Sequence, residues 1–173
     1  MTQSPPQPSL LPDSAAPAPP GGDRALVFDA LAFAQAPQTV SQLLDLMALA
    51  GLRSVRGSAM HAKDLRQCLD DLARQGLAGR DERGRWTAER EAGWRRFRAL
   101  VQDETSREAW WQAWRAQNHF DRGYGIAYFD SASYAGALRI VVHCGRDAAA
   151  FNRLGALVGP SSFAQQALRE ALL

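Results

Sequence analysis

Apolar residues recur at helical spacing in two successive stretches near the beginning of the chain. The first opens at Asp23, which stands where a side-chain cap would start a helix, and Pro37 interrupts it. The second opens at Thr39 or Ser41 and stops at Gly51. The apolar positions are Leu26, Val27, Ala30, Leu31 and Ala34 in the first stretch, and Leu43, Leu44, Met47 and Leu49 in the second. The pattern predicts two helices separated by the proline.

A third helix and a small hairpin follow. The inward stripe of this helix is Ala62, Leu65, Leu69, Leu72 and Ala73, and the helix ends near Gly76. Residues 77–80 and 85–88 are short enough to be strands. Residues 81–84 supply the turn between them, with Gly84 free to adopt a positive φ. The order is therefore three helices and then a two-stranded hairpin.

Beyond the hairpin the pattern is again helical. Residues 89–101 form a basic amphipathic run, and residues 105–108 (Thr-Ser-Arg-Glu) have the capping-box spacing that starts a tryptophan-rich helix. A later helical stripe ends at Gly145, although the β-rich stretch 138–142 leaves a strand there as the alternative. We expect a helical extension over residues 89–173. The predicted fold class is mostly α with a small β-hairpin.

The first residues differ in composition from the rest of the chain. Residues 1–22 contain seven of the nine prolines and few apolar residues, so they cannot bury enough surface to offset the entropy of ordering them. We expect a disordered Pro-rich tail at 1–22, a compact domain at 23–88 and the helical extension at 89–173. An apolar helical pattern at residues 167–173 has no stop signal, and we expect the extension to continue in a longer protein.

Composition excludes some classes of protein. Hydrophobic residues make up 46% of the 173 residues and charged residues 22%, which is typical of a globular protein. No segment is long and apolar enough to predict a membrane span, and the N-terminus has no signal-peptide pattern. We therefore expect a cytoplasmic protein that does not enter a membrane.

The residues that usually carry catalysis or bind metals are scattered. The two cysteines, Cys68 and Cys144, are far apart and outside any CxxC pair, so we expect both to be reduced core residues. The three histidines lie far from one another, and no phosphate-binding loop motif is present. The sequence predicts no metal, no cofactor and no enzymatic activity for this chain on its own.

Positive charge is concentrated in the middle third of the chain. Residues 1–50 carry one arginine and four aspartates, for a net charge of −3. Residues 51–100 carry twelve basic and seven acidic residues, for a net charge of +5, and residues 101–173 carry seven of each. Nineteen of the twenty cations are arginines, which form planar bidentate contacts with phosphates; a GC-rich genome would produce the same bias.

The run LxxLxxxGL at residues 69–77, together with the order of predicted elements, resembles the winged helix-turn-helix family over residues 23–88. The resemblance implies that the third helix enters the DNA major groove by its N-terminal half and that the hairpin, or wing, touches the DNA backbone or minor groove. The implied helix contacts are His61, Lys63, Arg66 and Gln67, and the implied wing contacts are Arg80, Arg83 and Arg85. The order of elements also resembles the N-terminal part of a Swi/Snf-type helicase, although no motor motif is present.

Acidic residues on the third helix leave a second interpretation open. Asp64, Asp70 and Asp71 would repel phosphates, and winged helices also serve as protein-docking modules. The alternative function is therefore a docking module for a protein partner, or for the rest of a longer chain. An exposed apolar patch on the C-terminal helices would favour it.

Tryptophans on the later helix allow two uses. Trp110, Trp111 and Trp114 place two rings on one helical face and one beside it, where they could stack on bases. Packing against the next helix is the favoured interpretation, because each ring buries a large apolar area. We expect Trp86 and Trp94 to hold the hairpin and the following helix on the core.

Overall fold

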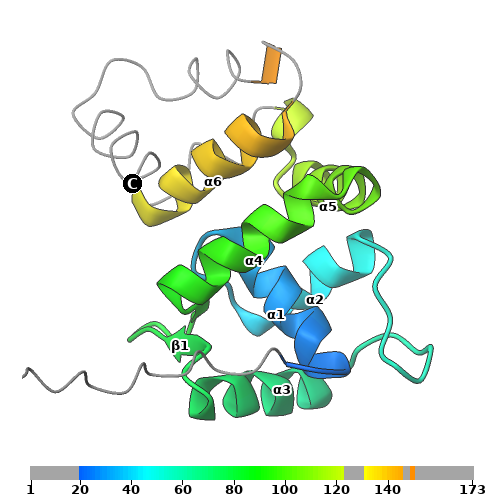
Figure 1. Cartoon of the computed structure of the whole chain (residues 1–173), viewed down its shortest axis with the longest axis vertical. Coiled ribbons are helices and arrows are strands. Elements are labelled where there is room, and N and C mark those ends of the chain that lie inside the picture. Colours follow the sequence, from blue (N-terminus) through cyan, green and yellow to red (C-terminus); the bar gives the residue numbers. More distant parts are fainter. Residues whose placement is uncertain (1–19, 123–130, 146–148, 151–173) are drawn as a thin grey trace, which may run out of the picture.

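The structure is a computed structural model that describes residues 20–122, 131–145 and 149–150. The elements are α1 (Asp23–Ala34), α2 (Val40–Leu49), α3 (Ala62–Arg74), β1 (Ala78–Arg80), β2 (Trp86–Ala88), α4 (Arg90–Gln102), α5 (Glu104–Gln117), the 3-10 helix η1 (Phe120–Arg122) and α6 (Ser131–Cys144). The two strands pair antiparallel (Figure 1). The predicted fold class, mostly α with a small β-hairpin, is confirmed. The predicted tail up to residue 19 and most of the chain after Gly145 lie outside the described residues.

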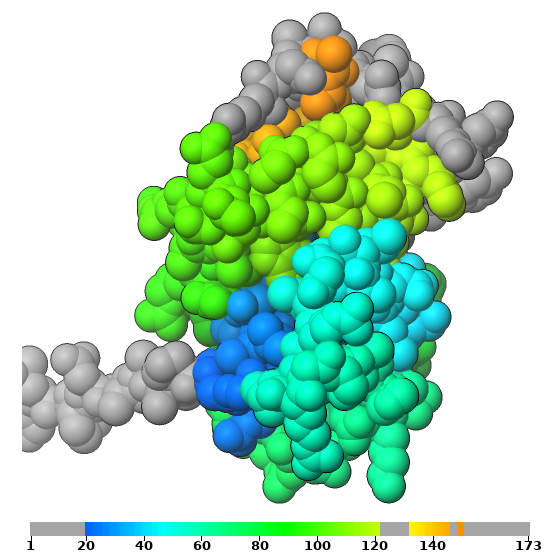
Figure 2. All heavy atoms as spheres, turned by 90° about the vertical axis from the view of Figure 1, so that its right-hand side faces the viewer, coloured from blue at the N-terminus to red at the C-terminus, as the bar shows by residue number. Residues whose placement is uncertain are grey.

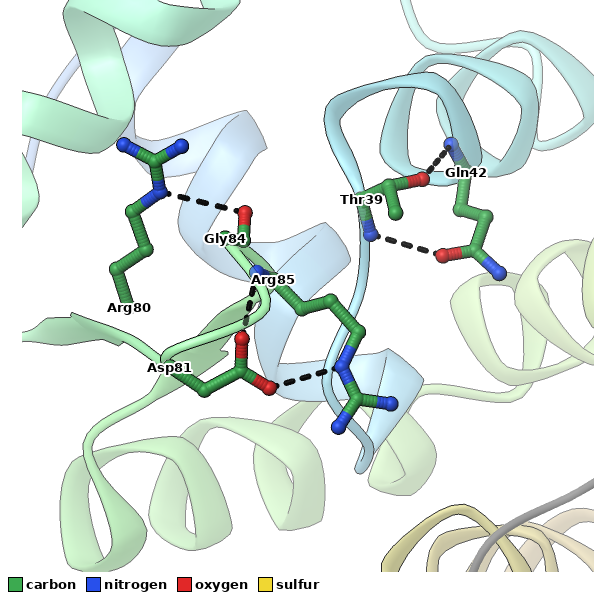
Figure 3. A network of polar contacts seen from close by, with 6 residues as sticks. All are labelled: Thr39, Gln42, Arg80, Asp81, Gly84 and Arg85. Atoms are coloured by element: carbon green, nitrogen blue, oxygen red, sulfur yellow. Dashed lines mark hydrogen bonds and ion pairs between the residues drawn. The ribbon is translucent and has the colours of Figure 1, made fainter.

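The first two helices begin in different ways. Thr39 starts α2 with a complete capping box: its side chain accepts a hydrogen bond from the Gln42 amide, and the Gln42 side chain accepts one from the Thr39 amide (Figure 3). Of the two predicted starts, the structure thus selects Thr39. The prediction for Asp23 was wrong, because Gly22 occupies the N-cap position of α1 and Asp23 is the first helical residue.

The start of α5 also differs from its prediction. The Thr-Ser-Arg-Glu segment at 105–108 does not form the cap, because the helix begins earlier, at Glu104. Asp103 is both the C-cap residue of α4 and the N-cap residue of α5. Its carboxylate accepts a hydrogen bond of 2.7 Å from the Ser106 amide. A single residue joins the two helices, so residues 105–108 lie inside α5 and cannot form the predicted capping box at its start.

Residues 138–142 are helical, so the strand alternative is wrong. They lie within α6, and the buried face of that helix includes Leu138, Ile140 and Val141. Packing of this face against the rest of the protein outweighs the β-propensity of its branched residues. Gly145 follows the helix directly, as predicted.

The hydrophobic core is continuous from the first helices into the later ones. Helix α1 lies at its centre and is buried around most of its circumference, with α3 on one side and α4 on the other (Figure 1). Phe33 of α1 stacks on Trp110 of α5, with ring centroids 5.2 Å apart. The helices that share this core are arranged in two layers. Figure 2 shows α1 to α3 in blue to teal below and α4 and α5 in green above.

All three tryptophans of α5 are buried, which confirms the packing interpretation. Trp111 and Trp114 stack on each other, and both contact the ring of Phe120. Trp86 is buried beneath the hairpin, as expected. Both cysteines are free and buried, as expected.

Helix α6 approaches α1 closely at a glycine. A Cβ atom on Gly136 would overlap the carbonyl oxygen of Gln35 and would lie 3.2 Å from the Cβ of Ala36. Only glycine allows the two backbones to come this near. Among the described helices, none is both long and apolar enough to cross a membrane.

Candidate nucleic-acid interface

Helix α3 presents four of the predicted contacts on its outer side. Its buried face is Leu65, Cys68, Leu69 and Leu72. This apolar stripe fixes the rotation of the helix, so the other side faces solvent. His61, Lys63, Arg66 and Gln67 are all exposed. The structure therefore brings the four predicted helix contacts together in the first half of α3.

These four side chains differ in how strongly the protein already holds them. His61 occupies the N-cap position of α3 and makes no capping hydrogen bond with its side chain. Lys63 and Arg66 have no ion-pair partner among the described residues. Gln67 donates a hydrogen bond of 3.0 Å to Asp71. Lys63 and Arg66 are thus the cations that α3 offers to a ligand.

The charge of α3 changes sign along its length. Residues 62–67 carry Lys63 and Arg66 against Asp64, for a net charge of +1. Residues 68–74 carry Arg74 against Asp70 and Asp71, for a net charge of −1. Arg74 is paired with Asp71, while Asp70 is exposed. A polyanion would be attracted to the first half of the helix and repelled by the second.

Backbone bonds attach the hairpin, at the strand end next to its turn, to the connection between α1 and α2. Gln38 and Trp86 form an isolated antiparallel bridge, with hydrogen bonds of 2.8 and 2.7 Å between their amides and carbonyls. The guanidinium of Arg80 lies 5.6 Å from the centre of the Trp86 ring and donates a hydrogen bond to the Gly84 carbonyl. Arg80, although exposed, is therefore held along the hairpin.

The turn of the hairpin is built around Asp81 (Figure 3). Its carboxylate accepts hydrogen bonds of 2.8 Å from both the amide and the Nε of Arg85. The amide bonds and the guanidinium of Arg85 lower the pKa of this carboxyl, although burial opposes them. Gly84 has φ 77°, as its position in the turn predicted. The charge of Arg85 is thus largely used within the turn.

Arg83 is the hairpin arginine that remains available. It is exposed at the turn, and no ion pair joins it to another described residue. Of the three predicted hairpin contacts, Arg83 points its charge to solvent, Arg80 lies over Trp86, and Arg85 is paired with Asp81.

Sequence reasoning did not single out five further exposed arginines in the middle third of the chain. They are Arg53 and Arg56 in the loop before α3, and Arg90, Arg95 and Arg98 on α4. The twelve basic residues of 51–100 were the available signal, because the predicted contacts include only five of them. Their neighbour Arg96 is not available, since it forms a bidentate pair with Asp29 of α1.

A groove of about 910 Å³ lies between α6 and the ends of α1, β2 and α4. Its apolar walls include Leu31, Ala88, Trp94, Ala135, Leu138 and Val142. Val142 is 55% exposed, so apolar surface of α6 reaches solvent. This apolar surface on α6 is the feature that bears on the docking alternative.

Within the described residues, no three histidine, cysteine or acidic side chains gather in a way that could hold a metal ion. Comparisons of the chain with protein-family models, with curated proteins and with solved structures find no match.

Proposed function

We propose that the protein binds duplex DNA through a winged helix-turn-helix module at residues 23–88, without enzymatic activity of its own. The observation that carries the proposal is a set of exposed cations that form no ion pair with another described residue, on the first half of α3 and at the hairpin turn: Lys63, Arg66 and Arg83. Each cation that neutralises a phosphate releases condensed counterions, and this release favours binding.

In this proposal the residues of α3 and the hairpin have different roles in binding DNA. Lys63 and Arg66 bind phosphates beside the groove that the first half of α3 enters, while His61 and Gln67 face the bases. Arg83 binds the backbone beyond the helix. Arg80 and Arg85 contribute by holding the shape of the hairpin, because their guanidinium groups already contact Trp86 and Asp81.

The test is the salt dependence of duplex binding, measured by fluorescence anisotropy with the full chain and a labelled random duplex. We expect Arg83→Ala to reduce the slope of log K against log salt by about 0.9, which is the value of one phosphate contact. The matched control is Arg74→Ala, which removes the same charge from an arginine paired with Asp71 on the second half of α3. Its slope should equal that of the wild type. Equal slopes in all three proteins would remove the hairpin from the interface.

A second candidate function is docking of a protein partner. The specific observations that favour it are the groove beside α6 and the exposed Asp70 on α3. Absence of any duplex binding by the wild type at low salt would overturn the DNA proposal and favour docking. We further propose, from the resemblance alone, that the module is part of a longer protein of the Swi/Snf helicase kind, and, from the sequence pattern of the N-terminus, that it acts in the cytoplasm.

A further inference from the structure

The loop that joins α2 to α3, residues 50–61, has a defined conformation. The Ser54 amide donates a hydrogen bond of 2.8 Å to the Ser58 carbonyl, and the Gly57 amide donates one of 2.8 Å to the Ser54 carbonyl. The hydroxyl groups of Ser54 and Ser58 lie 3.1 Å apart. These bonds close residues 54–58 into a tight turn at the tip of the loop.

Two contacts hold this loop against the rest of the protein. At its base, Leu52 and Met60 are partly buried against the hydrophobic core. Near its tip, the Val55 amide donates a hydrogen bond of 2.7 Å to the carboxylate of Asp23, at the start of α1. The bond links residues that are distant in sequence, so it fixes the direction in which the loop projects.

The loop carries two exposed positive charges. Arg53 and Arg56 are exposed, and residues 50–61 contain no acidic residue. Neither arginine has an ion-pair partner among the described residues. The Asp23 carboxylate, which contacts the loop, already accepts a hydrogen bond from the Val55 amide. Both guanidinium groups are therefore available to a ligand.

The loop and the hairpin lie at opposite ends of α3. The loop leads into the first residue of the helix, and the hairpin follows its last turn; Figure 1 shows the loop projecting on the right and the hairpin on the left. A helix of 13 residues is about 20 Å long, which exceeds the roughly 12 Å width of the major groove. Elements at the two ends of such a helix can therefore reach both phosphate strands that border the groove.

We infer that the loop at residues 50–61 is a second phosphate-binding element, in which Arg53 and Arg56 bind the backbone of a nucleic-acid duplex at the end of α3 opposite the hairpin. The inference rests on the proposed function, since it assigns a further part of the same interface. It also accounts for the bond between Asp23 and Val55, which holds the arginine-bearing turn beside the positive half of α3.

The first test measures the salt slope of duplex binding by the full chain for two double variants of equal charge. The variant R53A/R56A removes the loop arginines, and R95A/R98A removes two exposed arginines of α4. We expect the loop variant to lower the slope by about 1.8, the value of two phosphate contacts. The α4 variant should keep the wild-type slope.

The outcomes separate this inference from the proposed function. Equal losses in both double variants would show a general effect of net charge and would overturn the role of the loop. A loop variant with the wild-type slope would also overturn it, while leaving duplex binding intact. If the wild type shows no salt-sensitive binding, the proposed function fails and the inference fails with it.

A second test asks whether Asp23 positions the loop. Asp23→Asn and Asp23→Ala remove the same negative charge, but only asparagine keeps an oxygen that accepts the Val55 amide. Removal of a negative charge by itself favours binding to a polyanion. We expect D23A to bind the duplex about fivefold more weakly than D23N, the effect of one net hydrogen bond. Equal affinities of the two variants would overturn the positioning role.

Discussion

His143, in the last turn of α6, is a single residue whose protonation affects the fold. Its ring lies edge-on to Trp94 and Phe97 of α4, with centroid distances of 5.4 and 5.6 Å. Partial desolvation beside these rings, and then the positive charge of Arg98, lower the pKa of the imidazole below its ordinary value of 6.5. The folded protein therefore favours the neutral ring.

This lowered pKa predicts a loss of stability on mild acidification. The unfolded chain binds a proton at the ordinary pKa of 6.5, and the folded protein binds it only at lower pH, so the free energy of unfolding falls as the pH drops below 6.5. Urea unfolding at pH values on either side of 6.5 measures the effect. His143→Gln should show a weaker pH dependence in this window. Identical pH dependence in both proteins would contradict the prediction.

At the residue scale, sequence reasoning succeeded where the partner of a residue is close in the chain. Thr39 and Gln42 form their capping box within one turn, and Gly84 adopts its positive φ within a four-residue turn. Asp23 was assigned incorrectly because its partner, Val55, is far away in the sequence. A carboxylate at a helix start has the same local signature whether it caps the helix or binds a distant loop.

Among the elements, α3 is the one on whose rotation the proposed interface depends. Leu69 is fully buried, while its neighbour Asp70 is exposed. This one-residue alternation places Lys63 and Arg66 on the solvent side. An error in the rotation of the helix would bury the proposed contacts instead.

Two neighbouring substitutions check this rotation. Leu69→Ala should reduce the free energy of unfolding by about 2 to 5 kcal/mol, because it leaves a cavity in the core. Asp70→Ala should change it by only about 0.5 kcal/mol or less, as is usual for a surface residue. Chemical denaturation followed by tryptophan fluorescence measures both. Comparable effects at the two positions would mean that the buried face of α3 is wrongly assigned.

The helices and the hairpin were predictable because each carries its own periodic pattern or turn. The boundary between α4 and α5 was not predictable. Asp103 caps both helices, and the sequence has a capping-box pattern that begins two residues later, at Thr105. The predicted contacts on α3 and the hairpin are on the surface, as expected. Their pairing with Asp71, Asp81 and Trp86 depends on side-chain geometry that the pattern does not contain.

In the whole molecule, α6 packs on the core along a buried face and meets α1 and α4 closely at particular residues. Gly136 meets the end of α1, His143 meets α4, and the groove lies between these elements. Cys144, at the end of α6, is buried, and burial raises the pKa of its thiol to about 12. The reactivity of this thiol thus reports whether α6 is docked.

Gly136→Ala should release α6 from the core. Alanine in a helix normally adds up to about 1 kcal/mol of stability over glycine, but here the added Cβ would overlap the Gln35 carbonyl. We expect lower stability and faster labelling of Cys144 by a thiol reagent. Cys68 on α3 is the internal control, and its labelling rate should not change. Increased stability with slow labelling would refute the close approach of the two helices.

The arrangement of the whole molecule was the part that sequence alone could not supply. Amphipathic patterns showed that each helix has a buried face, but they did not show that α1 shares one core with both α3 and α4. The groove beside α6 could not be foreseen either, because it is formed by residues from both halves of the chain.

The bridge between Gln38 and Trp86 has a consequence for how this surface can evolve. Its two hydrogen bonds join backbone groups only, so they place few demands on the side chains that lie beyond them. The exposed turn residues Glu82 and Arg83 are thus free to vary while the strands next to the turn stay fixed. Descendants of this chain could acquire new binding preferences through changes in the turn, without rebuilding the fold that carries it.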